Sequence, residues 1–534
     1  MLRKGVSLTD ETEVTMSSRC LNMLAGWGLF LVLTPGFLTG QTPNVFLGSG
    51  FSEEDGIVTT RHEITLDGRT LGYTARAGLI PIRDNATGEA HAHMYFISYS
   101  LEDNPNNPPR PLTFLWNGGP GSSSSLVHLL GFGPKRINSE GELQPNQGTW
   151  LEMSNLVFVD PIGTGYSRPL KKDYTAEFYQ NRGDAESVAE FIRVYLTRAD
   201  AWDAPLFLAG ESFGVERATR VADILQRKRI PVTGMMLIGL VPRLAPIAEE
   251  IEAALALPTY TASAFHHERL DNELQRDFDA ALHEAETWSL EQYAPAIAHH
   301  KSLGDKDLSN LLAGLSRLSG VDKKILDGGA VDSTLTLGLG AFAQTLLYEQ
   351  GRVLGHYDSR MTGIRDTTQI MYDPTTDPSL QNMFDEVPVI RYMRDELGYE
   401  SDLRYQGPFG GSYPPPKSFR GDWMSMRWDW SGPSLGSGPP QVDDQTSDPT
   451  PAVERIMRAD ENLHVYTSCG YYDLVCSYAV IGHMEDLLDP SLSSRVTVRT
   501  YHGGHATYLD DKVRLQMRVD VTSFIREAVH KQLP

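Results

Sequence analysis

Residues 205–219 read PLFLAGESFGVERAT, and this stretch decides the fold. The apolar run Leu206–Ala209 suits a buried strand, and the residues after Gly214 suit a helix. Gly210 and Gly214 stand two positions before and after Ser212, and such small residues allow a sharp strand-to-helix turn that exposes the serine hydroxyl. The stretch therefore predicts a nucleophile elbow with Ser212 as the nucleophile. A glycine-rich turn with an incidental serine is the alternative.

Further apolar runs, each ended by a loop, predict more buried strands. They cover Leu112–Trp116, Leu156–Val159 and Gly234–Leu240, and parallel strands buried on both faces have this composition. Gly183–Thr197 has apolar residues at helical spacing and lies between two of these strands, which predicts a doubly wound α/β fold with a mostly parallel sheet. Alternating segments between residues 56 and 101 predict antiparallel strands that open the sheet.

The chain leaves this α/β pattern and later returns to it. Residues 41–242 form the first part of the predicted core, residues 243–450 an insertion, and residues 451–534 the second part of the core. The insertion contains helical segments such as Ala248–Leu257 and Asn272–Trp288. The second part of the core is predicted to hold strands at Leu463–Thr467 and Arg495–Tyr501 and a closing helix at Asp511–Lys531.

Residues 405–441 of the insertion are rich in Pro and Gly, which predicts an irregular loop. The same loop holds Trp423, Trp428 and Trp430. We therefore expect it to pack against the rest of the protein.

Residues 1–40 contain an apolar stretch, Leu21–Gly40, which follows Arg19 and precedes polar residues. This pattern predicts an export signal. The run is also long enough for an uncleaved membrane anchor, and a core helix is a third reading. Initiation at Met16 instead of Met1 would give a leader of more ordinary length. We expect export to a periplasmic or extracellular location, with membrane contact only if the leader is retained.

The composition excludes several classes of protein. Lys and Arg number 47 against 69 Asp and Glu, which gives a formal charge of −22 and argues against nucleic-acid binding. Hydrophobic residues make up 40% and charged residues 22%, close to ordinary globular usage, which argues against both disorder and a multi-span membrane protein. Three cysteines permit at most one internal disulfide, and no Cys/His cluster of metal-binding type occurs. We therefore expect no metal.

A glycine-rich loop follows the predicted strand Leu112–Trp116 and reads NGGPGSS from Asn117. In a fold with a nucleophile elbow, such a loop offers one backbone N–H to the oxyanion, and the residue after the nucleophile offers another. Gly119 and Phe213 are the candidates. A phosphate loop or a simple turn is the alternative, but no Gly-Lys-Ser/Thr follows, so we expect no nucleotide cofactor.

A serine hydroxyl is a poor nucleophile at neutral pH, so it needs a base, and the base needs an acid that orients it. With an elbow of this kind the chain order is Ser, then Asp or Glu, then His, and the last two follow late strands. Asp473 and His505 have these positions. His502 is the competing base, but it lies at a strand end, whereas His505 follows two glycines.

Five separated motifs resemble the serine carboxypeptidase family of α/β-hydrolases. They are WNGGPGSSS (116–124), NLVFVDPIGTGYS (155–167), GESFG (210–214), GYYDLVC (470–476) and GGHA (503–506). The resemblance implies an α/β-hydrolase fold, with the insertion forming a helical cap over the cleft. It also implies a Ser212–Asp473–His505 triad, an oxyanion hole from Gly119 and Phe213, and a site for the C-terminal carboxylate of the substrate made by Asn117, Gly118 and Glu211.

The chain departs from the family pattern at two positions. Ser122 stands where family members usually carry a cysteine, and Val215 stands where they carry a second glycine after the elbow. The missing loop cysteine is typical of bacterial members. Cys476 matches a cysteine that the family keeps near the acid. We expect Cys469 to be a buried free thiol.

The resemblance implies an exported serine carboxypeptidase that acts on peptides with a free C-terminus and needs no cofactor. An esterase or acyltransferase that uses the same triad is one alternative, because function resides in sites and not in folds. A catalytically silent binding protein is another. Glu211 can donate a hydrogen bond to a carboxylate only when it is protonated, so we expect activity to favour acidic pH. The sequence gives no indication of oligomeric state.

Overall fold

The computed structural model describes residues 50–51, 56–102, 108–366, 376–381, 386–407, 428–429 and 452–530. All of these belong to one compact unit, Ser49–Pro534. The predicted leader, residues 1–40, and most of the loop at 405–441 lie outside the described residues. Among the helices of the described part, none is both long enough and apolar enough to cross a membrane.

A ten-stranded mixed sheet forms the centre of the fold, in the order β1-β2-β3-β7-β4-β9-β10-β13-β14, with β8 paired to β3. Strands β1 to β3 and the β3–β7 pair are antiparallel. From β7 to β14 every neighbouring pair is parallel. This arrangement confirms the predicted antiparallel opening and mostly parallel core. The strands are β1 (Val58–Leu66), β2 (Arg69–Arg83), β3 (Ala90–Leu101), β4 (Leu112–Trp116), β7 (Asn155–Asp160), β8 (Arg168–Pro169), β9 (Leu206–Glu211), β10 (Gly234–Ile238), β13 (His464–Gly470) and β14 (Val496–Tyr501).

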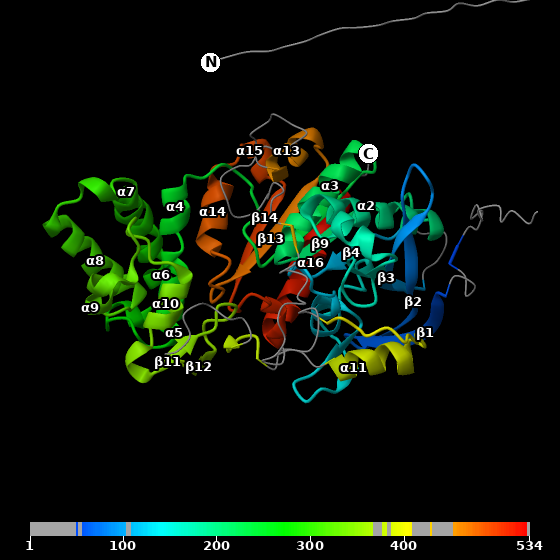
Figure 1. Cartoon of the computed structure of the whole chain (residues 1–534), viewed down its shortest axis with the longest axis horizontal. Coiled ribbons are helices and arrows are strands. Elements are labelled where there is room, and N and C mark those ends of the chain that lie inside the picture. Colours follow the sequence, from blue (N-terminus) through cyan, green and yellow to red (C-terminus); the bar gives the residue numbers. More distant parts are fainter. Residues whose placement is uncertain are drawn as a thin grey trace, which may run out of the picture. The chain divides into compact units, whose positions relative to one another are not determined.

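Helices cover both faces of the sheet, as the doubly wound prediction requires (Figure 1). Alternate side chains of β9 show this directly, since successive residues of a strand point to opposite faces. Leu206 and Leu208 belong to the apolar cluster that contains helices α2, α3, α13 and α14, whereas Phe207 and Ala209 belong to the cluster of α16 and the short π-helix η2. The bounds are α2 (Asn181–Arg198), α3 (Phe213–Arg227), α13 (Ala452–Ala459), α14 (Tyr478–Asp486), α16 (Asp511–His530) and η2 (Val127–Phe132).

Helices α4 to α10, which follow β10 in the chain, have an apolar core of their own, and we call this group of helices the cap (Figure 1). Leu474, from the loop after β13, is buried in that core. Helix α6 begins at Phe278, later than predicted, because the Asp277 side chain accepts a hydrogen bond from the backbone N–H of Ala280 and caps the helix there. The main cap helices are α4 (Glu249–Ala254), α5 (Leu257–His266), α6 (Phe278–Trp288), α7 (Ala294–Ala298), α8 (Asp305–Ser319), α9 (Lys323–Ile325) and α10 (Leu339–Thr345).

Residues 386–399 of the insertion pack against the sheet. Helix α11 (Glu386–Arg391) and the short π-helix η10 (Tyr392–Glu396) carry residues of the apolar cluster that includes β3. The hydroxyls of Tyr392 and Tyr99 are hydrogen bonded at 2.8 Å. The predicted boundaries of the insertion at 243 and 450 stay predictions.

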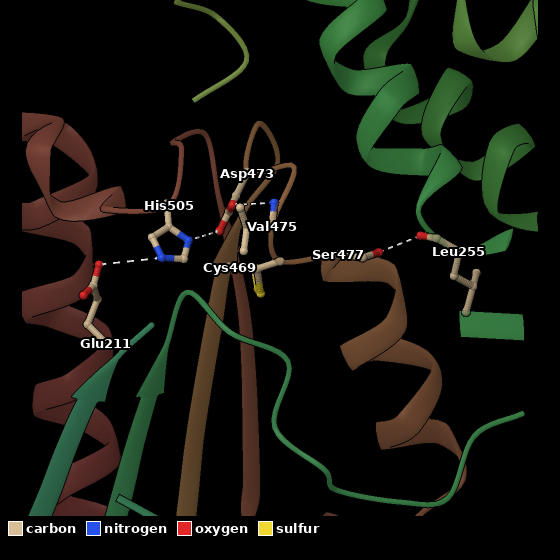
Figure 2. The surroundings of a disulfide bond; sticks show 8 residues. Glu211, Leu255, Cys469, Asp473, Val475, Ser477 and His505 are labelled. Atoms are coloured by element: carbon tan, nitrogen blue, oxygen red, sulfur yellow. Dashed lines mark hydrogen bonds and ion pairs between the residues drawn. A yellow bond between two sulfur atoms is a disulfide. The ribbon is translucent and has the colours of Figure 1, made fainter. Parts of the chain in front are cut away.

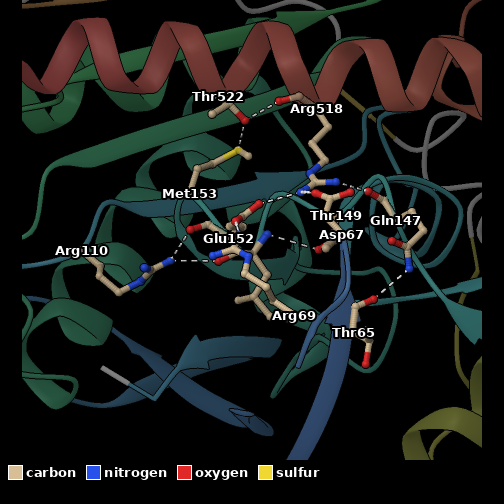
Figure 3. Close-up of polar contacts among 11 residues, drawn as sticks. Thr65, Asp67, Arg69, Arg110, Gln147, Thr149, Glu152, Met153, Arg518 and Thr522 are labelled. Atoms are coloured by element: carbon tan, nitrogen blue, oxygen red, sulfur yellow. Dashed lines mark hydrogen bonds and ion pairs between the residues drawn. The ribbon is translucent and has the colours of Figure 1, made fainter. Parts of the chain in front are cut away.

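A network of charged side chains joins the last helix to the first hairpin (Figure 3). The Nη2 atom of Arg518 on α16 lies 2.8 Å from Asp67 Oδ2, in the turn between β1 and β2, and 2.6 Å from Glu152 Oε2. Glu152 also pairs with Arg69 on β2. Because Arg518 is largely buried, this network fastens the C-terminal helix to the antiparallel edge of the sheet.

Candidate active site

The turn between β9 and α3 is built as the sequence predicts. Ser212 has φ 56° and ψ −132°, a conformation that residues other than glycine rarely adopt and that is typical of functional sites. A Cβ atom at Gly210 would collide with the carbonyl oxygen of Gly214, so the turn requires glycine at Gly210. The backbone N–H of Ser212 donates to the carbonyl of Ile238 at 2.8 Å, which ties the turn to the neighbouring strand β10.

Asp473 and His505 meet at the ends of β13 and β14 (Figure 2). The Nδ1 atom of His505 is 2.7 Å from Asp473 Oδ2, and the other carboxylate oxygen accepts a hydrogen bond from the Val475 N–H at 2.9 Å. Asp473 is completely buried. His502 is exposed, and its ring lies against Phe278. The fold therefore brings His505, and not His502, to the acid.

The second ring nitrogen of His505 is available for chemistry. In the part of the chain that the structure describes, His505 Nε2 is buried and has no hydrogen-bond partner. It faces Glu211 Oε1 at 3.9 Å (Figure 2). A base whose Nδ1 is held by a carboxylate and whose Nε2 is unengaged is arranged to take a proton from a neighbouring hydroxyl.

The three buried titratable groups influence one another. Burial alone would lower the pKa of His505, but the charge and hydrogen bond of Asp473, together with the charge of Glu211, raise that pKa to about 9. Burial raises the pKa of Glu211 and of Asp473 above the ordinary carboxyl range. When Glu211 is protonated, its charge no longer stabilises the imidazolium, so one of the causes that raise the pKa of His505 is removed while the effect of Asp473 remains.

The glycine-rich loop after β4 lies directly against the elbow. A Cβ atom at Gly118 would collide with the backbone nitrogen of Phe213 and would stand 2.7 Å from the carbonyl oxygen of Glu211. Gly119 follows with φ +101°, a conformation that favours glycine. Phe213 is the first residue of α3, where backbone N–H groups have no partner within the helix. The loop and the helix start can thus supply N–H groups to one point beside Ser212.

Asn117 and Glu211 form a buried polar pair between the loop and the elbow. The Asn117 side-chain amide donates to Glu211 Oε2 at 2.8 Å, and its Oδ1 accepts from the Val127 N–H at 3.0 Å. The second bond fixes the orientation of the amide, so its NH₂ group faces Glu211. Tyr508, on the turn after His505, is also buried here, and burial together with the Glu211 charge raises its pKa. Nothing in the motif spacing indicated Tyr508.

Arg217 is a second residue that the motifs did not indicate. Its guanidinium is fully buried, with Nε 2.6 Å from Asp184 Oδ2 on α2, and Nη1 donates to the Asn117 carbonyl at 2.7 Å. It also lies 5.4 Å from the ring centroid of Phe213. Arg217 therefore joins the glycine-rich loop to the elbow helix. The sequence did contain one indication of this role. Arg217 lies four residues before Val221 and therefore on the same buried face of α3, and a buried charge requires a partner.

Trp428 also packs against Phe213. Its ring meets the Phe213 ring edge to face at 5.5 Å, and its Nε1 donates to Asn181 Oδ1 at 2.9 Å. Trp428 is buried, so the expected packing of the Trp-containing loop is confirmed at this residue. Trp423 and Trp430 lie outside the described residues.

Cys469 and Cys476 form a disulfide. The bond closes the loop that carries Asp473, and Figure 2 shows it beside the acid. The expectation of a buried free thiol at Cys469 is therefore wrong. Within the described ranges, no group of three or more His, Cys, Asp or Glu side chains is arranged to hold a metal ion.

Comparison with known proteins agrees with this geometry. Residues 69–277, which include Ser212, match the model of the serine carboxypeptidase family. The pheromone-processing carboxypeptidase kex1 of Schizosaccharomyces pombe is 39% identical over 131 residues, which is 24% of this chain and 25% of that protein. The Saccharomyces cerevisiae protein of the same name is 40% identical over 101 residues, or 18% of this chain and 14% of that protein. This chain thus matches a quarter or less of the length of these curated relatives.

The structural comparison extends over most of the chain. The crystal structure of Kex1(delta)p, a prohormone-processing carboxypeptidase from Saccharomyces cerevisiae, has a TM-score of 0.50 and 16% sequence identity, and the match covers 85% of this chain and 91% of that one. At this identity the likeness shows the fold alone.

Proposed function

We propose that this chain, whose residues 69–277 match the model of the serine carboxypeptidase family, releases C-terminal amino acids from peptides through an acyl-enzyme on Ser212. One observation supports this most strongly: the Asn117–Glu211 pair lies beside the elbow, with Glu211 Oε1 only 3.9 Å from His505 Nε2. A peptidase that binds a terminal carboxylate needs hydrogen-bond donors there.

In the proposed reaction, neutral His505 takes the proton of the Ser212 hydroxyl through Nε2 while the serine oxygen attacks the carbonyl carbon of the last peptide bond. The N–H groups of Gly119 and Phe213 stabilise the resulting oxyanion. Asp473 holds the Nδ1 proton and stabilises the imidazolium. His505 then gives its Nε2 proton to the leaving amine, so the amino acid departs and an ester on Ser212 remains. Water, deprotonated by His505, hydrolyses this ester and restores the serine.

We assign recognition of the substrate's terminal carboxylate to Asn117, Gly118 and Glu211. The amide of Asn117 and the backbone N–H of Gly118 are donors, and protonated Glu211 adds a third. Ionised Glu211 would instead repel the carboxylate. The raised pKa of Glu211, caused mainly by burial, extends the pH range in which it stays protonated. The substrate class is therefore peptides with a free C-terminus.

We also propose export of the protein. The apolar stretch Leu21–Gly40 supports it. The disulfide between Cys469 and Cys476 gives independent support, because such bonds persist mainly in oxidising compartments. N-terminal sequencing of the mature protein tests this proposal, and a mature chain that begins at Met1 or Met16 would contradict a cleaved signal.

The proposed reaction is tested by amino-acid release from N-blocked peptides, with a fluorophosphonate as a serine-directed probe. We expect stepwise release from the C-terminus and a single adduct that peptide mapping places on Ser212. Ser212→Ala should lose both release and labelling. Amino-acid release that persists in Ser212→Ala would contradict the assignment of the nucleophile.

A further inference from the structure

The loop between two short cap strands touches both partners of the acid–base pair. Strands β11 (Arg352–Leu354) and β12 (Thr362–Ile364) form an antiparallel hairpin, and residues 355–361, GHYDSRM, connect them. We call residues 355–361 the hairpin loop. It comes from the insertion, whereas Asp473 and His505 come from the second part of the core.

The hairpin loop holds His505 through the main chain and through a ring. The backbone N–H of His505 donates to the Tyr357 carbonyl at 2.6 Å. The Tyr357 ring meets the His505 imidazole edge to face, with ring centroids 5.1 Å apart. A Cβ atom at Gly504 would collide with the Tyr357 carbonyl oxygen and with Asp358, so the close approach requires glycine at Gly504. The contact with the hairpin loop therefore explains why the GGHA motif has a glycine at Gly504.

The same loop holds Asp473 from both sides. The Ser359 N–H donates to the Tyr472 carbonyl at 2.9 Å, and the Leu474 N–H donates to the His356 carbonyl at 3.1 Å. Asp473 therefore lies between two residues that are each hydrogen bonded to the hairpin loop.

Arg360 makes the hairpin loop rigid. Its guanidinium binds both carboxylate oxygens of Asp358, at 2.9 and 2.6 Å, and donates to the His502 carbonyl at 3.2 Å. It also lies over the Tyr472 ring, 5.0 Å from the centroid. Arg360 thus connects the loop that carries the base with the loop that carries the acid.

The other side of the hairpin loop is fastened to the cap. The Ser359 hydroxyl is 2.6 Å from the Ser263 hydroxyl on α5, and the Ser359 carbonyl is hydrogen bonded to His267 Nε2 at 2.7 Å. Asp377 accepts from the His356 N–H at 2.9 Å. The hairpin loop is therefore held between the cap and the two catalytic loops.

We propose that the hairpin loop sets the distance and orientation between Asp473 and His505, with Tyr357 and Arg360 as positioning residues; this inference rests on the proposed function. Strand β14 is the edge of the sheet, so the sheet supports the base loop on one side only. The hairpin loop supplies the missing support from the cap. A misplacement of about 1 Å at a catalytic group can cost about a hundredfold in rate, so this support determines the efficiency of the triad.

Two variants test the inference. Arg360→Met removes the three guanidinium hydrogen bonds and keeps an unbranched side chain, and Tyr357→Leu removes the ring beside His505. Arg317→Met is the matched control, because Arg317 is also a cap arginine paired with several carboxylates, Asp271, Glu273 and Glu284, none of them on the catalytic loops. Thermal unfolding and circular dichroism identify the variants that fold, and Arg360→Lys replaces Arg360→Met if that variant does not.

The measured quantities are the second-order rate of Ser212 labelling by a fluorophosphonate, and kcat and KM for an N-blocked peptide. We expect both folded variants to label about tenfold or more slowly than wild type, with kcat reduced similarly and KM within about twofold. Arg317→Met should label at the wild-type rate. A fall of less than about fivefold in both folded variants, or an equal fall in Arg317→Met, would overturn the inference. The labelling rate does not depend on peptide release, so a wild-type enzyme that labels at Ser212 but releases no amino acid would reject the proposed function and leave this test valid.

Discussion

Replacement of Glu211 by Gln tests the proposed recognition of the substrate carboxylate. In the structure Glu211 Oε2 accepts a hydrogen bond from Asn117 at 2.8 Å, which leaves the other oxygen to donate when the group is protonated. Gln offers the same arrangement at every pH, because its oxygen can accept from Asn117 and its NH₂ group can donate to the substrate. Glu211→Gln therefore mimics the protonated form of Glu211 at every pH.

The size of the effect follows from the geometry. A substrate carboxylate within hydrogen-bond reach of Glu211 would place two negative charges about 4 Å apart, and their repulsion is about 4 kcal/mol at an effective dielectric constant of about 20. That energy corresponds to about a thousandfold in affinity. Above the pKa of Glu211, we expect the KM of the wild-type enzyme to rise by about tenfold per pH unit towards this limit, while the KM of Glu211→Gln stays constant.

The assay measures kcat and KM for an N-blocked dipeptide with a free C-terminus from pH 5 to pH 9. Thermal unfolding at each pH is the control for loss of folded enzyme. Wild-type KM should rise with pH, since burial raises the pKa of Glu211 but does not prevent its ionisation at higher pH. A parallel rise in wild type and in Glu211→Gln would refute the reasoning, and so would wild-type activity that increases steadily up to pH 9.

Three further predictions concern the triad and its support. Asp473→Asn should lower kcat by about a thousandfold or more while the protein stays folded, because His505 loses the group that fixes its tautomer. Steady-state kinetics measure this change. A decrease in kcat of less than about tenfold would contradict the assignment of Asp473 as the acid. Arg217→Met should lower the free energy of unfolding, measured in urea, by about 3–5 kcal/mol, since it leaves Asp184 buried without its cation. The double variant that also carries Asp184→Asn should recover part of this loss. An equal loss of stability in the single and double variants would contradict this pairing. Asp473 and Glu211 raise the pKa of His505 to about 9 although burial opposes this, so its stabilising contribution is complete below about pH 6.5 and is lost as the pH rises towards 9. The melting temperature of the wild-type protein should therefore fall between pH 6.5 and pH 9 and should fall less in His505→Gln. An identical dependence of melting temperature on pH in the two proteins would contradict this prediction.

The sequence was sufficient for the features that depend on local patterns. The elbow follows from two glycines around Ser212, because their small size is what the turn requires. The parallel strands followed from short apolar runs, but their ends differ from the prediction: β9 runs two residues further, to Glu211, and β10 ends two residues earlier, at Ile238. Asp473 and His505 followed from chain order, since both must come after late strands.

The features that the sequence did not reveal depend on contacts between distant segments. The contacts of Arg217 with Asp184 and with the Asn117 carbonyl join three elements that no motif connects. The hairpin loop around Tyr357 has no catalytic signature, and only the folded chain brings it to His505. The disulfide of Cys469 could not be derived from composition, because three cysteines allow several pairings.

One pair of substrates tests the central claim most directly: the same N-blocked peptide with a free and with an amidated C-terminus, compared at acidic pH by release of the last residue. In the proposed site, Asn117, Gly118 and protonated Glu211 all donate hydrogen bonds to the substrate terminus, and a carboxylate offers them two acceptor oxygens where an amide offers one. The free acid should therefore be cleaved about a hundredfold or more faster than the amide. Ser212→Ala should cleave neither. Equal cleavage of the two peptides by the wild-type enzyme would contradict the assignment of a carboxypeptidase.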